Sequence, residues 1–400
     1  MTVNVSKPVV NVREKLAELD KPTGVAGEAM LRAETPQEQQ ALLGNFGRRN
    51  LVHNGAMKVA QRATSQTGIT STSGYYTVDR WAYYSQNIGS LAYTMTQSSD
   101  APDGFANSLK MECTTSQSSL HTQANVYVRQ FFEGQDMQQI GFGTSGAKHL
   151  TISFWVKASK TGPYTLSIYR QDNVRTSGLA YYVNSANTWE YKTLTFNPDT
   201  TGALDDDNNA SMQIAFFIAS GTNLQSGTFT NGTFKPYSES EYAVDGQTNI
   251  NISGDTWQIT GVQLELGKVA TPFEHRSYGE ELALCQRYYE VFKRGSVGAS
   301  VDDAYFTVGH AVANNRVESV YHYKVVKRAQ PTVSFSGTVY ASNSTGTGQA
   351  CTNSNVTFDV WGTRSTAVNF NVDSGTPFNA GDASRNYIGQ NSTFVFDAEL

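Results

Sequence analysis

The stretch GVQLELGKVATPFEHRSYGEELALCQRYY, residues 261–289, decides how the chain is organised. Its first part alternates apolar and polar side chains over 262–266, which predicts a strand with one buried face, and Pro272 ends that strand. Ser277 then precedes Glu280 at the spacing of a capping box, and a helix is predicted over 279–292. The apolar side of this helix would carry Leu282, Cys285, Tyr289 and Phe292. We interpret it as a joint between two β-domains.

The residues on both sides of this joint have the pattern of β-sheets. Residues 50–278 contain short alternating or wholly apolar segments, such as HLTISFWVKAS and SMQIAFFIAS, separated by Gly, Asn, Asp, Ser and Pro. Many short strands without helices between them are typical of a sandwich or jelly roll. Residues 293–400 return to the same pattern and predict a smaller C-terminal β-domain. The acidic segment 203–257 is interpreted as an insertion at one edge of the sandwich.

Residues 1–49 differ from the rest, because they are rich in Glu, Gln, Ala and Leu and poor in aromatic residues. Thr35, Pro36 and Glu38 mark the start of a short helix, and Gly44 marks its end. Helices of this length are not stable alone in water. We therefore expect a helical leader that packs on other copies of the chain or on a larger assembly.

Composition excludes several classes of partner. Charged residues make up 16% of the chain, against roughly 25% in ordinary soluble proteins, and the net charge is −5. A nucleic-acid binder needs a basic face, and no apolar run approaches the ~20 residues of a membrane span. We expect no nucleic-acid partner and no membrane insertion. The three widely spaced cysteines favour synthesis in a reducing cytoplasm rather than a disulfide framework.

Four blocks of the sequence resemble bacteriophage tail-fibre proteins, especially those of marine and cyanobacterial podoviruses. They are GRRNLVHNGAMKVAQRAT (47–64), GYYTVDRWAYY (74–84), QLELGKVATPFEHRSYGEELALCQRYYE (263–290) and the final FDAEL (396–400). The segment MLRAETPQEQQALLG (30–44) is also similar to a connecting segment of phage fibres. Within the second block we interpret Trp81 as a core residue and Asp79–Arg80 as a structural ion pair.

The resemblance implies a carbohydrate-binding-module-like jelly roll. The expected fold is then a jelly-roll β-sandwich, a short helix, a smaller C-terminal β-domain and a short helical N-terminal leader. It also implies a homotrimer that attaches to phage tail or virion subunits through residues 1–49 and binds host-surface polysaccharide as a receptor. The protein would be part of the virion after assembly in the host cytoplasm. No long coiled-coil heptads or repetitive shaft are visible, which favours a short globular spike.

Two alternatives stay open at this point. One is a fibre that decorates the capsid, and the other is a carbohydrate-binding module associated with a glycoside hydrolase. We expect no enzyme, because no nucleophile motif can be placed and the long β-helical repeats of fibre depolymerases are not visible.

Aromatic residues in loop-like segments are the candidates for ligand contact, since sugar rings stack their C–H faces on Tyr and Trp. The candidates are Tyr237 and Tyr242 in KPYSESEYAVDG, and Trp361 and Tyr387 in the C-terminal domain. For each of them a packing role is the alternative.

The loop DDDNNA (205–210) offers oxygen ligands from Asp205, Asp207 and Asn209, which is the chemistry that calcium prefers. The EF-hand pattern is not met, because Ala210 stands where the turn glycine belongs. The resemblance supports a structural calcium, which jelly-roll carbohydrate modules often hold, and a solvated loop is the alternative. No other cofactor is expected.

Overall fold

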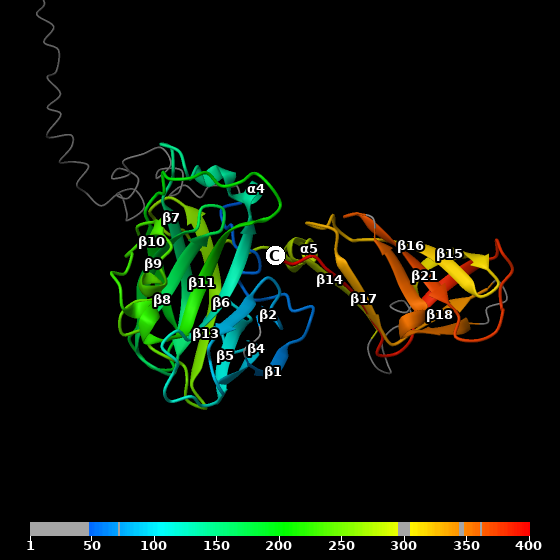
Figure 1. Cartoon of the computed structure of the whole chain (residues 1–400), viewed down its shortest axis with the longest axis horizontal. Helices are drawn as coiled ribbons and strands as arrows, with labels where there is room; N and C mark the ends of the chain where they lie inside the picture. Colours follow the sequence, from blue (N-terminus) through cyan, green and yellow to red (C-terminus); the bar gives the residue numbers. More distant parts are fainter. Residues whose placement is uncertain (1–47, 71–72, 295–304, 344–347, 361) are drawn as a thin grey trace, which may run out of the picture.

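The structure is a computed structural model that describes residues 48–70, 73–294, 305–343, 348–360 and 362–400. Antiparallel strands dominate these residues and the helices are short, so the predicted mostly β fold is confirmed. Figure 1 shows a larger part and a smaller part joined near α5, with the C-terminus at the joint. Residues 1–47 of the predicted leader lie outside the described residues. No helix in the described ranges has the length and hydropathy of a membrane span.

The larger part is a sandwich of two antiparallel sheets. Sheet A has the order β1 (Ser65–Ile69), β4 (Ala92–Ser98), β5 (Ser108–Thr115), β13 (Thr256–Leu266), β7 (Leu150–Ala158) and β10 (Glu190–Phe196). Sheet B has the order β12 (Lys235–Pro236), β9 (Arg175–Val183), β8 (Gly162–Arg170), β11 (Ala210–Ser220), β6 (Asn125–Glu133), β3 (Ala82–Gln86) and β2 (Gly74–Tyr75). From β5 to β8 successive strands alternate between the two sheets, as they do in a jelly roll.

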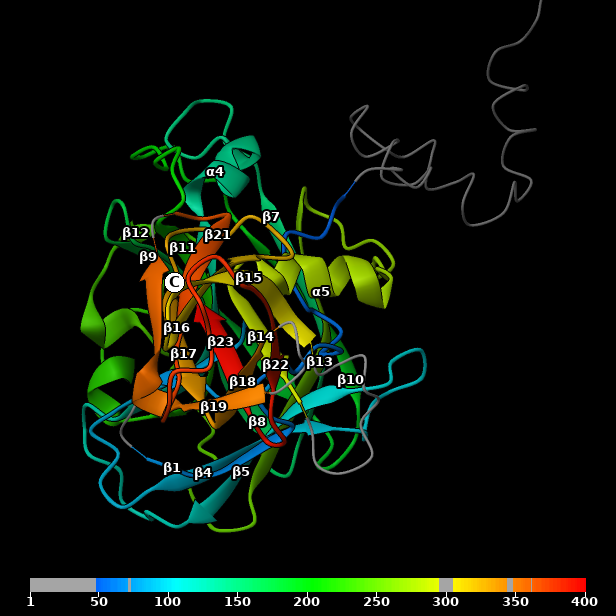
Figure 2. The same cartoon turned by 90° about the vertical axis from the view of Figure 1, so that its right-hand side faces the viewer.

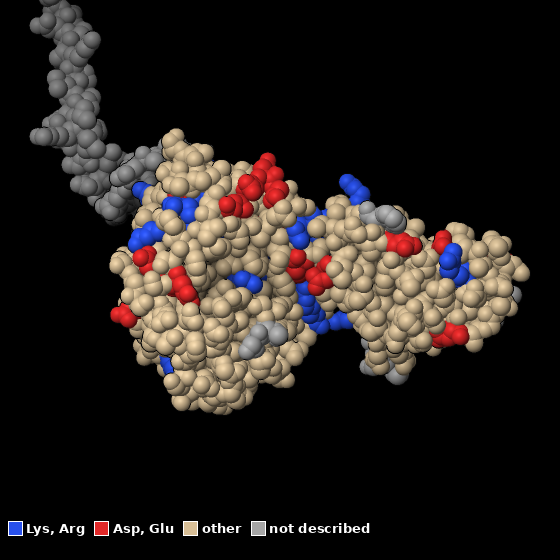
Figure 3. Space-filling view, viewed as in Figure 1, with Lys and Arg blue, Asp and Glu red and all other residues tan. Residues whose placement is uncertain are grey.

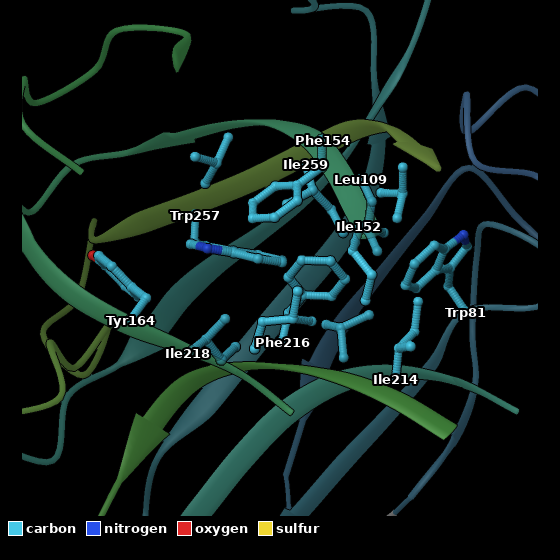
Figure 4. Close-up of a cluster of buried hydrophobic side chains, with 14 of the residues drawn as sticks. Trp81, Leu109, Ile152, Phe154, Tyr164, Ile214, Phe216, Ile218, Trp257 and Ile259 are labelled. Carbon is cyan, nitrogen blue, oxygen red and sulfur yellow. The ribbon is translucent and has the colours of Figure 1, made fainter. Parts of the chain in front are cut away.

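Aromatic rings fill the space between the two sheets (Figure 4). Phe216 on β11 lies 6.0 Å from the ring centre of Trp81 and 5.9 Å from that of Trp257. Its edge-to-face contact with Phe154 on β7 joins sheet B to sheet A. All four side chains are fully buried, and such rings contribute large apolar areas to a core. The prediction that Trp81 is a core residue is confirmed.

The interpretation of 203–257 as an edge insertion is wrong, because β11 lies in the middle of sheet B between β8 and β6. The physical reason is the alternation in SMQIAFFIAS, which directs every second apolar side chain into the core. Within 203–257, the segment 221–249 runs over the outer face of sheet B and adds the short edge strand β12 to that sheet. Two short 3₁₀ helices lie within it, η2 (Thr222–Gln225) and η3 (Glu239–Glu241).

The helix α5 (Tyr278–Gln286) begins at the predicted capping box. The Glu280 amide donates to the Ser277 hydroxyl over 3.3 Å, and the Ser277 amide donates to the Glu280 carboxylate over 2.9 Å. The predicted end of the helix at residue 292 is wrong. Residues Tyr289–Lys293 form strand β14, which pairs with β23 (Thr393–Asp397). Pairing with a strand from the end of the chain outweighs the helical spacing of the apolar residues in this segment.

The smaller part contains two sheets and a hydrophobic core of its own. Sheet C has the order β14, β23 and β17 (Thr332–Ser336). Sheet D has the order β19 (Gly348–Thr352), β18 (Thr338–Ser342), β22 (Ala383–Ile388), β15 (Tyr305–Ala313), β16 (Arg316–His322), β21 (Ser365–Asn371) and β20 (Val356–Val360). The remaining short helical segments of the described residues are α4 (Gly134–Met137), η1 (Gln138–Ile140) and η5 (Asn353–Asn355). Figure 2 shows this part end-on, in front of the sandwich.

The sequence blocks that carry the phage-fibre resemblance meet at the joint between the two parts. Arg80 forms a buried ion pair with Glu399 of the final block, and its guanidinium lies 3.4 Å from the centre of the Tyr288 ring. Arg287 donates two hydrogen bonds, of 2.7 and 2.6 Å, to Glu133 on β6. Burial alone would raise the pKa of Glu133, but the hydrogen bonds from Arg287 hold it below its ordinary value. These contacts therefore hold the smaller part in place against the sandwich.

The predicted Asp79–Arg80 ion pair is wrong. Arg80 has a positive φ of 72°, and it pairs with Glu399 instead. The Asp79 carboxylate accepts hydrogen bonds from the amide and the side chain of Gln61, over 3.0 and 2.6 Å. Burial raises the pKa of Asp79 to about 6, although those hydrogen bonds lower it. Neighbours in sequence here have different partners, because the backbone turns between them.

Candidate functional site

The outer face of sheet B carries an aromatic surface. On β6 the residues Val126, Val128 and Phe132 point into the core, so Tyr127, Arg129 and Phe131 point outward. Across the sheet, Gln213 on β11 pairs with Phe131 on one side and with Tyr169 on β8 on the other. We use the name aromatic face for five half-buried or exposed residues of this surface, which are Tyr84, Arg129, Phe131, Tyr169 and Tyr237.

The segment 221–249 covers one end of this outer face and positions Tyr237. Tyr242 is 5% exposed and packs edge-on against Phe217 and Tyr127. Tyr237 is 39% exposed and packs edge-on against Tyr242 at 5.2 Å and Tyr169 at 5.6 Å. The structure therefore brings the two predicted residues together but gives them different roles. Tyr242 is corrected from a ligand contact to a support, because its buried ring has no free surface on which a ligand could stack.

Arg129 lies between two rings of the aromatic face. Its guanidinium carbon is 4.7 Å from the ring centre of Tyr84 and 4.5 Å from that of Phe131. Its Nη1 donates to the Gln213 side-chain oxygen over 3.3 Å. No carboxylate of the described residues lies within 4.0 Å of this guanidinium, so its partners are ring faces and one amide oxygen. The cation is therefore positioned by its neighbours and left available for an oxygen acceptor.

The hydroxyl groups of Tyr237 and Tyr169 stay protonated at physiological pH. Burial, with Tyr242 nearby, raises the pKa of Tyr237 to about 12, and burial also raises the pKa of Tyr169. A protonated tyrosine hydroxyl both donates and accepts hydrogen bonds. The aromatic face thus combines flat apolar rings, hydroxyl groups and one guanidinium, which is a combination suited to hydroxyl-rich ligands.

The two predicted ligand residues of the smaller part have different outcomes. Tyr387 lies on β22, where its ring stacks on that of Tyr340 at 5.2 Å and meets that of Tyr305 at 6.3 Å. It is far in sequence and structure from the aromatic face, on another sheet. Trp361 lies outside the described residues.

The predicted calcium loop lies beside α4. The Gln135 amide donates to the Asp207 carbonyl, and the Gly134 amide donates to the Asn209 carbonyl, so the loop is held by its backbone. The Asp207 carboxylate accepts two hydrogen bonds from Asn209, while the Asp205 amide donates to Asp172. Figure 3 shows acidic side chains gathered over this region.

In the described ranges no group of three or more His, Cys, Asp and Glu side chains is placed to hold a metal ion. Calcium binding by this loop, with its asparagine ligand, stays a prediction.

Sequence reasoning missed Tyr84, Arg129, Phe131 and Tyr169. A signal was present in NVYVRQFFE, where Tyr127, Arg129 and Phe131 recur at every second residue and so share one face of a strand. That pattern does not say which face is the outer one, because both faces of β6 are rich in apolar side chains.

Comparisons with known proteins give likenesses of structure only. No protein-family model matches the chain, and no curated protein matches it. The tailspike protein 4 enzymatically active domain of bacteriophage CBA120 is 15% identical, with 54% of this chain and 21% of that chain covered and a TM-score of 0.29. A CBM4 structure is 14% identical, with 54% and 99% covered and a TM-score of 0.27. A family 11 carbohydrate-binding module from Clostridium thermocellum, in complex with a tetrasaccharide, is 14% identical, with 52% and 99% covered and a TM-score of 0.26.

The chain spans about a fifth of the length of the tailspike structure. A TM-score below 0.5 does not define a common fold, and these likenesses leave the family of this chain open.

Proposed function

We propose that this protein is a virion adhesin, a trimeric tail fibre or spike, that binds host-surface polysaccharide through the aromatic face. The observation that carries the proposal is the exposed ring of Tyr237 on the same outer face of sheet B as Arg129, which has no carboxylate of the described residues within 4.0 Å. Sugar rings present C–H faces that pack on aromatic rings, and their hydroxyl oxygens accept hydrogen bonds from guanidinium groups.

The proposed ligand is a polymer, and the proposed assembly is a homotrimer attached to tail or virion subunits through residues 1–49. Three copies of a weak site on one particle multiply the effective affinity, so a single aromatic face can be modest in strength. The joint supports this role, because a buried ion pair between Arg80 and Glu399 and a partly buried one between Arg287 and Glu133 hold the two parts in one orientation. We propose binding without turnover.

Binding of the full-length chain to immobilised bacterial surface polysaccharides tests the aromatic face. Tyr237→Ala should weaken binding by about 30-fold, which corresponds to the ~2 kcal/mol of an interface anchor. The matched control is Tyr278→Ala on α5, where the tyrosine is 56% exposed and lies outside the face. Equal affinities of the two variants would overturn the assignment of the aromatic face.

Two further measurements test the assembly and the absence of turnover. The native mass of the full-length chain should be that of a trimer of 43.7 kDa subunits. A monomer at micromolar concentration would remove the fibre proposal but not the binding site. Release of reducing ends from a bound polysaccharide would show an enzyme instead of an adhesin.

A further inference from the structure

A second exposed aromatic surface lies on the outer face of sheet D, in the smaller part. Three neighbouring strands each place one tyrosine in the same row, since Tyr387 pairs with Tyr340 on one side and with Tyr305 on the other. The rings of Tyr387 and Tyr340 are stacked, with an angle of 17° between their planes, and Tyr305 meets Tyr387 at 69°. We call these three residues the tyrosine ladder.

The ladder borders a hollow of about 540 Å³, which is lined by Tyr305, Phe306, Thr307, Val308 and Arg385. The hollow is shallow and open to solvent, so a ligand would lie along it and not inside a closed cavity. Tyr305 is 52% exposed and Val308 is 72% exposed, so apolar surface faces solvent here instead of the core. Contiguous exposed apolar patches mark interaction sites, whereas single exposed apolar residues do not.

The Tyr387 ring reaches across β18 to the edge strand β19. A Cβ added to Gly348 on β19 would lie 2.2 Å from the Tyr387 hydroxyl oxygen, so a larger residue there would displace the end of this ring. The ring lies between Tyr340, on which it stacks, and Tyr305, whose ring it meets at 6.3 Å. Flat, fixed rings lose little conformational entropy when a ligand stacks on them.

A positive charge completes the surface. Arg385 lies two residues before Tyr387 on β22, so both side chains share the outer face, and it pairs across the sheet with Val308. Arg385 is exposed, and no carboxylate of the described residues lies within 4.0 Å of its guanidinium. Guanidinium groups bind carboxylates with two parallel hydrogen bonds, so this cation complements an acidic ligand.

We propose that the tyrosine ladder and Arg385 form a second binding site, for a saccharide that carries a carboxylate group. The ring faces of the saccharide pack on Tyr305, and the carboxylate of the saccharide pairs with Arg385. This site goes beyond the aromatic face of the sandwich, because it lies on another sheet and shares no residue with it. Two sites on one chain would let a single polymer bind twice, which raises the effective affinity without any new contact.

The test uses the full-length chain with Tyr237→Ala, so that binding at the aromatic face is weakened about 30-fold. The probes are an oligogalacturonate and the same oligosaccharide with its carboxyl groups reduced to alcohols, measured by isothermal titration calorimetry. The Tyr237→Ala chain should bind the acidic probe at least tenfold more tightly than the neutral one. Tyr305→Ala in this background should abolish binding, and Arg385→Gln should remove the preference for the acid. Arg364→Gln, an exposed arginine of the same part, is the matched control and should change neither.

The possible results separate this proposal from the proposed function. If the Tyr237→Ala chain binds neither probe while the wild type binds them, the second site is wrong and the aromatic face stands. If the Tyr237→Ala and wild-type chains bind alike and Tyr305→Ala abolishes binding in both, the second site stands and the aromatic face is wrong. If Tyr305→Ala lowers the native mass and leaves saccharide binding unchanged, the ladder is a contact between copies of the chain, and the proposal is overturned.

Discussion

Replacing Glu399 by glutamine should uncouple the C-terminal tail from the sandwich. In the folded chain Glu399 pairs with Arg80, whose side chain is fully buried, and it lies 3.4 Å from Arg62. Burial alone would lower the pKa of Arg80, but the Glu399 carboxylate raises it above its ordinary value. The substitution removes the carboxylate that pairs with Arg80 among the described residues, and it leaves a buried cation in contact with a ring and a carbonyl group.

The magnitude follows from the burial of the pair. Removing one partner of a buried ion pair costs about 3–5 kcal/mol, and a glutamine oxygen that still accepts a hydrogen bond places the effect near the lower limit. We therefore expect a loss of about 3 kcal/mol in the free energy of unfolding. The control is Glu318→Gln, because Glu318 also pairs with an arginine, Arg316, but both side chains are largely exposed. Exposed pairs contribute about 0–1 kcal/mol.

Urea unfolding of the full-length variants, followed by tyrosine and tryptophan fluorescence, measures the difference. The Glu399→Gln chain should unfold at a lower urea concentration than Glu318→Gln. Equal losses of less than 1 kcal/mol in the two variants would refute the reasoning, since burial would then have no influence on the joint.

Three further predictions concern the core, one buried acid and the calcium loop. Phe216→Ala should lower the free energy of unfolding by about 3–5 kcal/mol in the same urea assay, because the ring contacts both sheets, and a loss below 1 kcal/mol would contradict the core described above. Burial gives Asp79 a pKa of about 6 in the folded chain, against an ordinary value of 3.8, so the folded state binds more protons between about pH 4 and 6 and loses stability as the pH rises through that window. Asp79→Asn should remove up to about 3 kcal/mol of this loss in the free energy of unfolding. If the free energy of unfolding still changes between pH 4 and 7 as much as in the wild type, the Asp79 carboxyl is not the cause. Added calcium should raise the unfolding temperature of the wild type but not of Asp207→Asn, and an equal response of both chains would contradict calcium binding by the 205–209 loop.

Local sequence signals predicted the beginnings of elements better than their ends. The start of α5 depends on Ser277 and Glu280, which lie one helical turn apart, so the capping box is visible in the sequence. The end of α5 depends on the pairing of β14 with β23, which lies at the far end of the chain. The same reason explains the error at 203–257, since only the positions of β6 and β8 make β11 a central strand.

The candidate site was predicted less completely than the fold. Tyr237 and Tyr242 stand five residues apart in one polar segment, and nothing in that segment says which of them is buried. The sequence also gave no reason to connect Arg129 with Tyr84, because their contact crosses from β6 to β3.

The sequence by itself determined the β class of this protein, the alternation that directs Phe216 and Trp257 inward, and the start of the connecting helix. These properties depend on side chains within a few residues of one another, where periodicity and capping act. Only the tertiary structure decided that Arg80 pairs with Glu399, that Tyr242 supports Tyr237, and that three tyrosines of sheet D share one row. Each of these contacts joins segments that are distant in sequence, and the register of the strands and the burial of their charges select it.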